Sequence, residues 1–137
     1  MPSAGWALQK AVYQTLSSNA GLTATVGAGK VFDDVPRDAD YPYVTFGLSQ
    51  VRDWATGTEE GHEHVFSLHV WSRENGRKEV HEAMQHMEQA LHDEALTLEG
   101  HQLINLRHEF SEARREPDGE TYRGLVRFRA TTEPQAV

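Results

Sequence analysis

The sequence predicts an α+β fold in which two helices pack on one face of a sheet of about four strands. Two segments repeat apolar residues at steps of three and four, which is typical of helices with one buried side. Four other segments alternate apolar and polar residues, which is typical of strands. The expected order is helix, two strands, helix, two strands, with an antiparallel or mixed sheet.

The first helix is expected from residue 3 to residue 19. Ser3 is suited to cap its start, and the Asn-Ala-Gly sequence at 19–21 is expected to end it. A glycine-containing loop, GAGK at 27–30, follows; it lacks the full spacing of a phosphate-binding loop and is interpreted as a turn. The residues expected on the core side of this helix are Trp6, Leu8, Val12 and Leu16.

The first strand pair and the second helix occupy the middle of the chain. Phe66, Leu68 and Val70 alternate with other residues and are expected to face the core. In the second helix, apolar residues recur at steps of four, three and four on one side. The expected ranges are a short extended piece at 31–32, a loop at 33–42, strands at 43–54 and 62–72, and a helix at 75–93.

The second strand pair is expected at 102–112 and 121–132. The EPDGE sequence at 116–120 indicates a hairpin turn, because Asp-Gly favours positive φ. One side of the earlier strand is expected to carry Ile104, Leu106, His108 and Phe110. The sheet face without helices is expected to be semi-polar and to carry Arg107, Arg127 and Arg129.

Length and composition indicate one folded unit. The 137 residues, 38% of them hydrophobic, fit a single domain over 1–137, with a loose tail at 133–137. The net charge of −8 disfavours sequence-independent binding to nucleic acid and to anionic membranes. The chain has no cysteine, which excludes disulfides and thiolate chemistry. It lacks a long apolar run and a signal-peptide pattern at its start, so assembly in the cytoplasm is expected.

The search for catalytic and metal-binding constellations predicts none. The eight histidines include HEAMQH at 81–86, but a spacing of five puts its two histidines about 140° apart on a helix. No Gly-x-Ser-x-Gly nucleophile motif is present. A carboxylate pair for glycoside chemistry stays open, because the sequence does not give the distance between the carboxyl groups. We therefore expect no catalytic residues, no cofactor and no metal.

Two surface groups have open interpretations. Trp54, near a strand end, is expected either to cover the core or to anchor an interface. Arg114 and Arg115, beside the Asp-Gly turn, are expected either to be solvated or to contact an acidic neighbour.

Several stretches taken in order resemble one family. They are FDDVPRDADYPYVTFG at 32–47, VRDW at 51–54, HVWSRENGRKE at 69–79, and the whole segment from 96 to 133. The combination is similar to the tail terminator, or tail-completion, proteins of long-tailed phages, especially the branch found in gene transfer agents. The resemblance covers residues 6–133.

The resemblance implies a structural role without catalytic residues. Such proteins form rings, commonly hexamers, that cap the head-proximal end of the tail tube, stop its growth and meet the head connector or stopper, while DNA passes through the hole. Physical reasoning adds candidate surfaces. Heterologous contacts between copies are expected at Arg52, Asp53, Trp54, Arg114 and Arg115. Loops that approach a DNA channel are expected at Asp33, Asp34, Asp38, Glu59 and Glu60.

Two other functions stay open from the sequence. A small hydrolase or ligand-binding domain would use the histidines. Another connector or stopper ring protein of the same particle would share the composition and the fold class.

Overall fold

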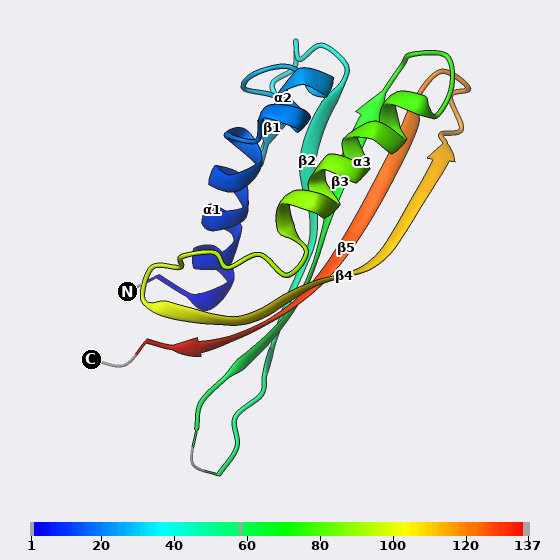
Figure 1. Ribbon diagram of the computed structural model, residues 1–137. Coiled ribbons are helices and arrows are strands. Elements are labelled where there is room, and N and C mark those ends of the chain that lie inside the picture. The colour runs from blue at the N-terminus through cyan, green and yellow to red at the C-terminus, as the bar shows by residue number, and fades with distance from the viewer. Residues whose placement is uncertain (1, 58, 136–137) are drawn as a thin grey trace.

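In the part of the chain that the structure describes, three helices cover one face of a five-stranded sheet in a two-layer α+β fold (Figure 1). The computed structural model describes residues 2–57 and 59–135. The sheet order is β1-β2-β3-β5-β4; β1 and β2 are parallel, and the other neighbours are antiparallel. The elements are α1 Ala4–Ser17, α2 Ala20–Val26, β1 Val31–Phe32, β2 Tyr43–Asp53, β3 His62–Ser72, α3 Lys78–Leu91, β4 His101–Arg115 and β5 Tyr122–Pro134.

Helix α1 begins and buries its apolar side largely as predicted. Ser3 accepts a hydrogen bond from the Trp6 amide at 3.2 Å, which satisfies a free donor at the helix start. Leu8, Val12 and Leu16 are buried. The prediction for Trp6 was wrong: its side chain is 52% exposed. Trp6 lies two residues before Leu8, about 200° away around the helix, and therefore points away from the core.

Helix α2 is a third helix where a loop was expected. Asn19 does end α1, but its side chain also accepts a hydrogen bond from the Leu22 amide at 2.8 Å and so caps a new helix. Leu22 and Val26 are buried. A Cβ at Gly21 would stand 2.4 Å from His86 Nδ1, so the glycine permits close packing of α2 on α3.

The predicted short piece at 31–32 is a fifth strand, β1. Val31 and Phe32 pair in parallel with Val44 and Thr45 of β2, which makes the sheet mixed. The sequence predicted about four strands because two residues are too few to display an alternating pattern. β1 covers only this part of β2. On the edge of β2 opposite β3, no strand of the described residues lies beside β2 from Phe46 onward.

The core lies between the helices and one face of β3 and β5. The rings of Phe66 and Phe128 stack with centroids 5.4 Å apart, and Leu68, Val70 and Val126 are fully buried. Burying each of these side chains contributes about 1.5–3 kcal/mol relative to exposure. The predicted apolar side of α3 is confirmed as the side that covers these strands, with Val80, Ala83, Met84, Met87 and Leu91 buried.

Strand β4 differs from the expected regular alternation. Its pairing with β5 shifts between Leu103 and Asn105 and again between His108 and Phe110. Each β-bulge inserts a residue and reverses which face the following side chains take. Leu106 is therefore buried, whereas Ile104 and Phe110 are 44% and 42% exposed, and the prediction that they share its side was wrong.

Strand β5 continues past residue 132, where the sequence predicted its end. Glu133 and Pro134 belong to β5, and the Gln135 amide donates to the Gly100 carbonyl at 3.0 Å. The last two residues of the predicted 133–137 tail lie outside the described residues. No helix in the described part of the chain combines the length and the apolar character needed to cross a membrane.

Candidate interaction surfaces

The two predicted interface segments lie at opposite ends of the molecule. Arg52 and Asp53 end β2, and Trp54 follows in the β2–β3 hairpin, which projects past the helices as an arm (Figure 1). Arg114 and Arg115 end β4 at the other end, next to the turn that leads into β5. The structure therefore does not bring these residues together in one chain. Contacts between two copies are the arrangement in which both segments are used at once.

The arm is a hairpin whose two sides are joined by backbone hydrogen bonds. The Trp54 amide donates to the Gly61 carbonyl at 2.8 Å, and the Thr56 amide donates to the Glu59 carbonyl at 2.8 Å. The Trp54 ring packs near Gly61 and is 51% exposed, so it lies on the arm and not over the buried core. An exposed tryptophan on a projecting hairpin matches the interface interpretation better than the core-lid interpretation.

The two arginines of the β4–β5 turn have different environments. Arg114 is opposite Arg123 and faces the sheet side without helices, whereas Arg115 is opposite Tyr122 on the other side. The Arg115 guanidinium donates to the Gly119 carbonyl through Nε at 3.1 Å and Nη2 at 2.9 Å. Arg115 therefore stabilises the turn, and Arg114 is the more available of the two for a partner.

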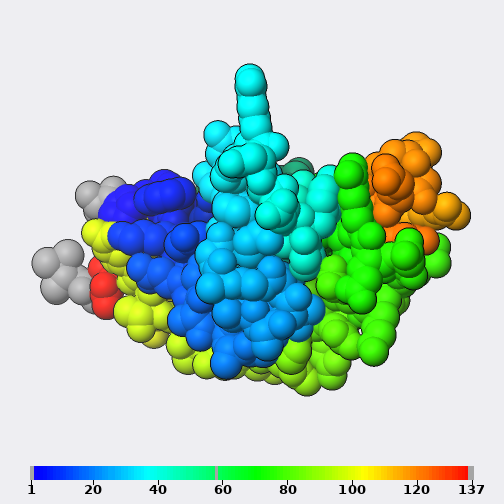
Figure 2. Space-filling model, turned by 90° about the horizontal axis from the view of Figure 1, so that it is seen from above, coloured from blue at the N-terminus to red at the C-terminus, as the bar shows by residue number. Residues whose placement is uncertain are grey.

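The acidic loops also lie at opposite ends. Asp33, Asp34 and Asp38 belong to the loop between β1 and β2, at the end of the molecule with the β4–β5 turn, as the view onto that end in Figure 2 shows. Glu59 and Glu60 lie at the tip of the arm (Figure 1). All five side chains are exposed. They form two separate acidic surfaces and not a single one.

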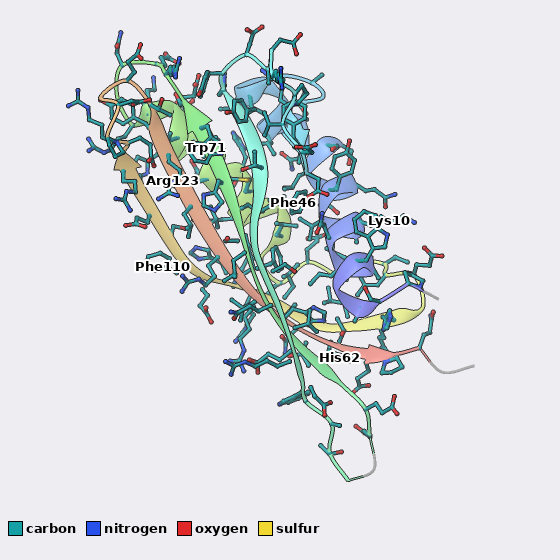
Figure 3. All side chains as sticks on the ribbon, turned by 180° about the vertical axis from the view of Figure 1, so that it is seen from behind. Lys10, Phe46, His62, Trp71, Phe110 and Arg123 are labelled. Carbon is teal, nitrogen blue, oxygen red and sulfur yellow. The ribbon has the colours of Figure 1, made fainter. Side chains whose placement is uncertain are left out.

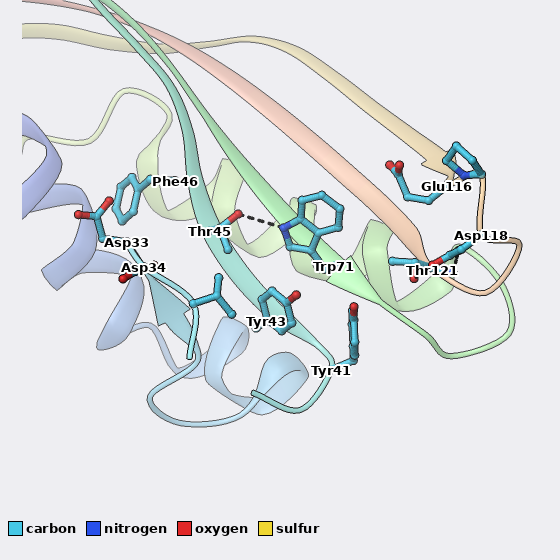
Figure 4. A pocket seen from close by; sticks show the side chains of 12 residues that line it. Asp33, Asp34, Tyr41, Tyr43, Thr45, Phe46, Trp71, Glu116, Asp118 and Thr121 are labelled. Carbon is cyan, nitrogen blue, oxygen red and sulfur yellow. Dashed lines mark hydrogen bonds between the residues drawn. The ribbon is translucent and has the colours of Figure 1, made fainter. Parts of the chain in front are cut away.

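An open hollow of about 610 Å³ lies between the 33–42 loop and the β4–β5 turn (Figure 4). The Trp71 indole donates to Thr45 Oγ1 at 3.0 Å in its floor. Its lining mixes carboxylates and aromatic rings: Asp33, Asp34, Glu116, Asp118, Tyr41, Tyr43 and Trp71. Sequence reasoning missed this hollow, because its lining comes from four separate segments that only the sheet register brings together.

Several charged groups around the hollow have structural partners. Arg123 Nε lies 2.9 Å from Glu116 Oε1. The Arg73 guanidinium carbon lies over the Tyr41 ring, 4.4 Å from the ring centroid. The Thr121 hydroxyl and amide and the Glu120 amide donate to Asp118, which lowers the pKa of that carboxyl to about 2. Burial is the main cause that raises the pKa of Tyr43 to about 12, and the hydrogen bond with Tyr41 adds to it. These groups hold the turn and loop in place and do not form an acid–base pair.

The histidines lie on several elements, and His62, His64 and His101 lie near one another. His81 is exposed on α3, and His86 lies against Gly21, so the HEAMQH histidines occupy different surroundings, as their spacing predicted. His64 is buried and hydrogen-bonded to Thr132 at 2.9 Å, and burial, then His62 and His101, lowers its pKa to about 4. Among residues 2–57 and 59–135, no three His, Asp or Glu side chains converge in a metal-binding cluster.

A second hollow, along the outer side of α1, is apolar. It has a volume of about 540 Å³, and its lining includes Trp6, Tyr13, Phe32 and Phe46. The sequence signal for this hollow was Trp6, which was expected on the core side of the helix.

A sheet with one face covered by helices, with a hairpin at each end and exposed side chains on both hairpins, offers surfaces for contacts with other subunits. The comparisons with known proteins agree. The family model of tail completion protein gp17 matches residues 10–133, and the chain belongs to that family. The protein is accordingly a structural component of a phage-like tail.

One solved structure is similar over nearly the whole chain. It is a chain of the "Virion of native gene transfer agent (GTA) particle", with 32% sequence identity and a TM-score of 0.89, covering 97% of this chain and 99% of that chain. No curated protein matches. The resemblance to tail-completion proteins and to gene transfer agents is confirmed, and the hydrolase alternative does not fit a family of tail structural proteins.

Proposed function

We propose that this protein forms a ring, a hexamer as the family resemblance implies, that caps the head-proximal end of a tail tube. In this role the ring ends tube polymerisation and joins the tail to the head connector or stopper. The observation that carries the proposal is the match to a tail completion family over residues 10–133, together with a close structural likeness to a chain of a gene transfer agent virion.

The arrangement of the surfaces supports head-to-tail contacts in such a ring. The arm with Arg52, Asp53 and Trp54 and the β4–β5 turn with Arg114 lie at opposite ends of one copy. Copies related by rotation place one patch against a different patch, which is the arrangement that closes a ring. The tail tube protein and the connector or stopper protein are the other expected partners.

The charge of the chain supports a conduit that does not hold DNA. With −8 per copy, the assembled ring repels a polyanion, so DNA would pass without specific binding. Asp33, Asp34, Asp38, Glu59 and Glu60 remain the proposed channel-facing groups. Because they form two separate surfaces, each loop is a separate proposal.

Capping of tube growth tests the function. Purified chain is added to polymerising tail tube protein, and tube length and subunits bound per tube are measured by electron microscopy and co-sedimentation. Growth arrest with a ring at one tube end is the expected result. Unchanged tube growth with no bound subunits would contradict it. A chain that binds the connector but never the tube would favour the alternative of a connector or stopper ring.

A further inference from the structure

The sheet face opposite the helices concentrates arginine in a chain that is acidic overall. The strand register puts six arginines at outward positions of β2, β4 and β5: Arg52, Arg107, Arg114, Arg123, Arg127 and Arg129. The predicted placement of Arg107, Arg127 and Arg129 on this face is confirmed. Figure 3 views this face and labels Arg123, Trp71 and Phe110 on it.

The charge difference between this face and the remaining surface is large. Glu63, Glu112 and Glu133 also point outward, and Glu109 in the bulge lies close enough to Arg129 to favour its charged form. Six arginines against four glutamates leave +2 on the face. Since the whole chain has −8, the rest of the molecule has −8 − (+2) = −10. The face thus holds 6 of the 13 basic residues and only 4 of the 21 acidic ones.

The residue types on this face match a protein interface better than a DNA interface. Arginine and aromatic residues are enriched in the centres of protein interfaces, whereas lysine, aspartate and glutamate are depleted, and the four glutamates are the exception on this face. No lysine or aspartate occupies an outward register position between Tyr43 and Glu133 in the paired strands. Trp71 and Phe110 lie among the arginines, with the Arg127 guanidinium 5.1 Å from the Phe110 ring centroid and the Arg123 guanidinium 5.7 Å from that of Trp71.

The opposite layer of the same molecule has the complementary charge. Residues 73–100, which include α3 and the segments on both sides of it, contain seven acidic and three basic residues, or −4. Glu74, Glu82, Asp93, Glu94 and Glu99 are exposed there. Within the same copy, Lys78 lies 3.9 Å from Glu82, Arg107 lies 3.5 Å from Asp93, and Lys10 lies 3.0 Å from Glu99, so these exposed pairs must rearrange to bind a second copy. The helix layer of one copy therefore presents the carboxylates that guanidinium groups bind best, in bidentate pairs.

We propose that the arginine-bearing sheet face of one copy packs on the acidic α3 layer of the next copy. This inference rests on the proposed ring, and it names two surfaces that meet in the ring in addition to the arm and the β4–β5 turn. Four strands about 4.8 Å apart and eleven residues of about 3.3 Å give the face a projected area of roughly 700 Å². A stable protein interface buries about 800 Å² per partner. The face alone is thus close to the size that a stable contact needs.

This packing also determines which charges stay exposed to DNA in the channel. Placing the arginines between copies removes them from the channel. The acidic helix layer, with −4, enters the same contact, so the surface left exposed has −6 of the −10 that lies outside the arginine face. A ring built this way would hold its subunits together by the same charges that would otherwise bind the passing phosphates.

Charge reversal on each surface, and on both together, tests the inference. Arg107→Glu with Arg114→Glu changes the net charge from −8 to −12 and is expected to reduce the number of subunits retained on tail tubes at least about tenfold. Lys30→Glu with Arg37→Glu, which lie on neither surface, makes the same change to −12 and is expected to retain binding. Glu82→Arg with Glu94→Arg reverses the helix layer and is expected to fail like the first double variant.

The quadruple variant, Arg107→Glu, Arg114→Glu, Glu82→Arg and Glu94→Arg, keeps the net charge at −8 and makes both surfaces complementary again. It is expected to recover ring formation, measured by electron microscopy of tube ends and by light scattering. Circular dichroism and thermal unfolding confirm that each variant is folded.

The other outcomes overturn the inference in distinguishable ways. If the unmodified chain caps tubes and the first double variant caps them equally well, the surfaces are wrong while the ring function stands. If the unmodified chain never binds tubes and stays monomeric, the ring function itself fails. If the double variant assembles normally but loses affinity for duplex DNA in a fluorescence anisotropy titration, the face binds phosphate and not a second copy.

Discussion

Gly124 of β5 lies directly beneath Val80 of α3, so close that a Cβ on the glycine would stand 2.5 Å from Val80 Cγ1. The same Cβ would be 2.8 Å from Met84 Sδ and 2.8 Å from Val70 Cγ1. This contact sets the distance between the helix layer and the sheet at the centre of the core. The glycine is needed for space, since its φ is not among the positive ones.

Gly124→Ala is expected to destabilise the fold by about 1–3 kcal/mol, because the added methyl forces α3 away from the sheet. The measurement is the free energy of unfolding from urea titration. Gly57→Ala serves as the control, because nothing lies within 4 Å of a Cβ there, and it should change stability by less than about 0.5 kcal/mol. Equal stability of the two variants would contradict the close packing.

The stability of the protein is expected to depend on the protonation of His64. Burial lowers the pKa of His64 from 6.5 to about 4, so below pH 6.5 the unfolded chain binds a proton that the folded chain does not. Stability is therefore fully present above pH 6.5 and falls as the pH drops toward 4, with about 2 kcal/mol lost at pH 5. Burial also lowers the pKa of His69, which adds a loss of the same sign.

Comparison with His64→Gln isolates this contribution, since the remaining titrating groups are shared. Unfolding free energies at pH 7.5 and pH 5 should differ less in this variant than in the unmodified chain. His81→Gln, on the exposed side of α3, is the matched control for replacing a histidine outside the core. A His64→Gln variant with the full pH dependence would exclude His64 as its source.

The arm is expected to act in assembly and not in folding. Trp54→Ala removes a half-exposed ring that lies outside the buried core, so the unfolding free energy should change by less than about 0.5 kcal/mol. If Trp54 anchors a contact, tube-bound subunits should fall at least about tenfold in co-sedimentation. Trp6→Ala, whose ring is equally exposed on α1, is the matched comparison. Normal retention of Trp54→Ala on tubes would remove the arm tryptophan from the interface.

The sequence predicted those helices and strands whose apolar residues recur at a regular spacing. The α3 stripe and the alternation around Leu68 identified core-facing sides because several residues repeat one period. Asn19 satisfies the signals for a helix end and a helix start alike, so α2 was missed. Two residues at 31–32 have no period, so they were predicted as a short extended piece and not as the fifth strand of the sheet.

The outward position of Arg114 shows why the site was harder to predict than the fold. Uninterrupted alternation from Leu106 would put Arg114 on the core side, because the two are eight residues apart. The bulge between His108 and Phe110 shifts the register by one and turns Arg114 to the open face beside Arg123. Nothing in the local composition marks that bulge, so the full arginine face emerges only from the strand pairing.

The acidic loops provide the last prediction, and they are tested separately because they lie at opposite ends of the molecule. In a loop that lines the channel, Asp33→Lys with Asp34→Lys, or Glu59→Lys with Glu60→Lys, replaces repulsion of DNA by attraction at every copy in the ring. At least one of these pairs should slow DNA delivery about tenfold at low salt and less at high salt, because screening weakens phosphate contacts. Delivery is measured per intact particle, counted by electron microscopy, so that failed assembly is not mistaken for slow passage. The neutral pairs, Asp33→Asn with Asp34→Asn and Glu59→Gln with Glu60→Gln, should have smaller effects in the same direction. Intact particles that deliver DNA normally with either lysine pair would place both loops away from the channel.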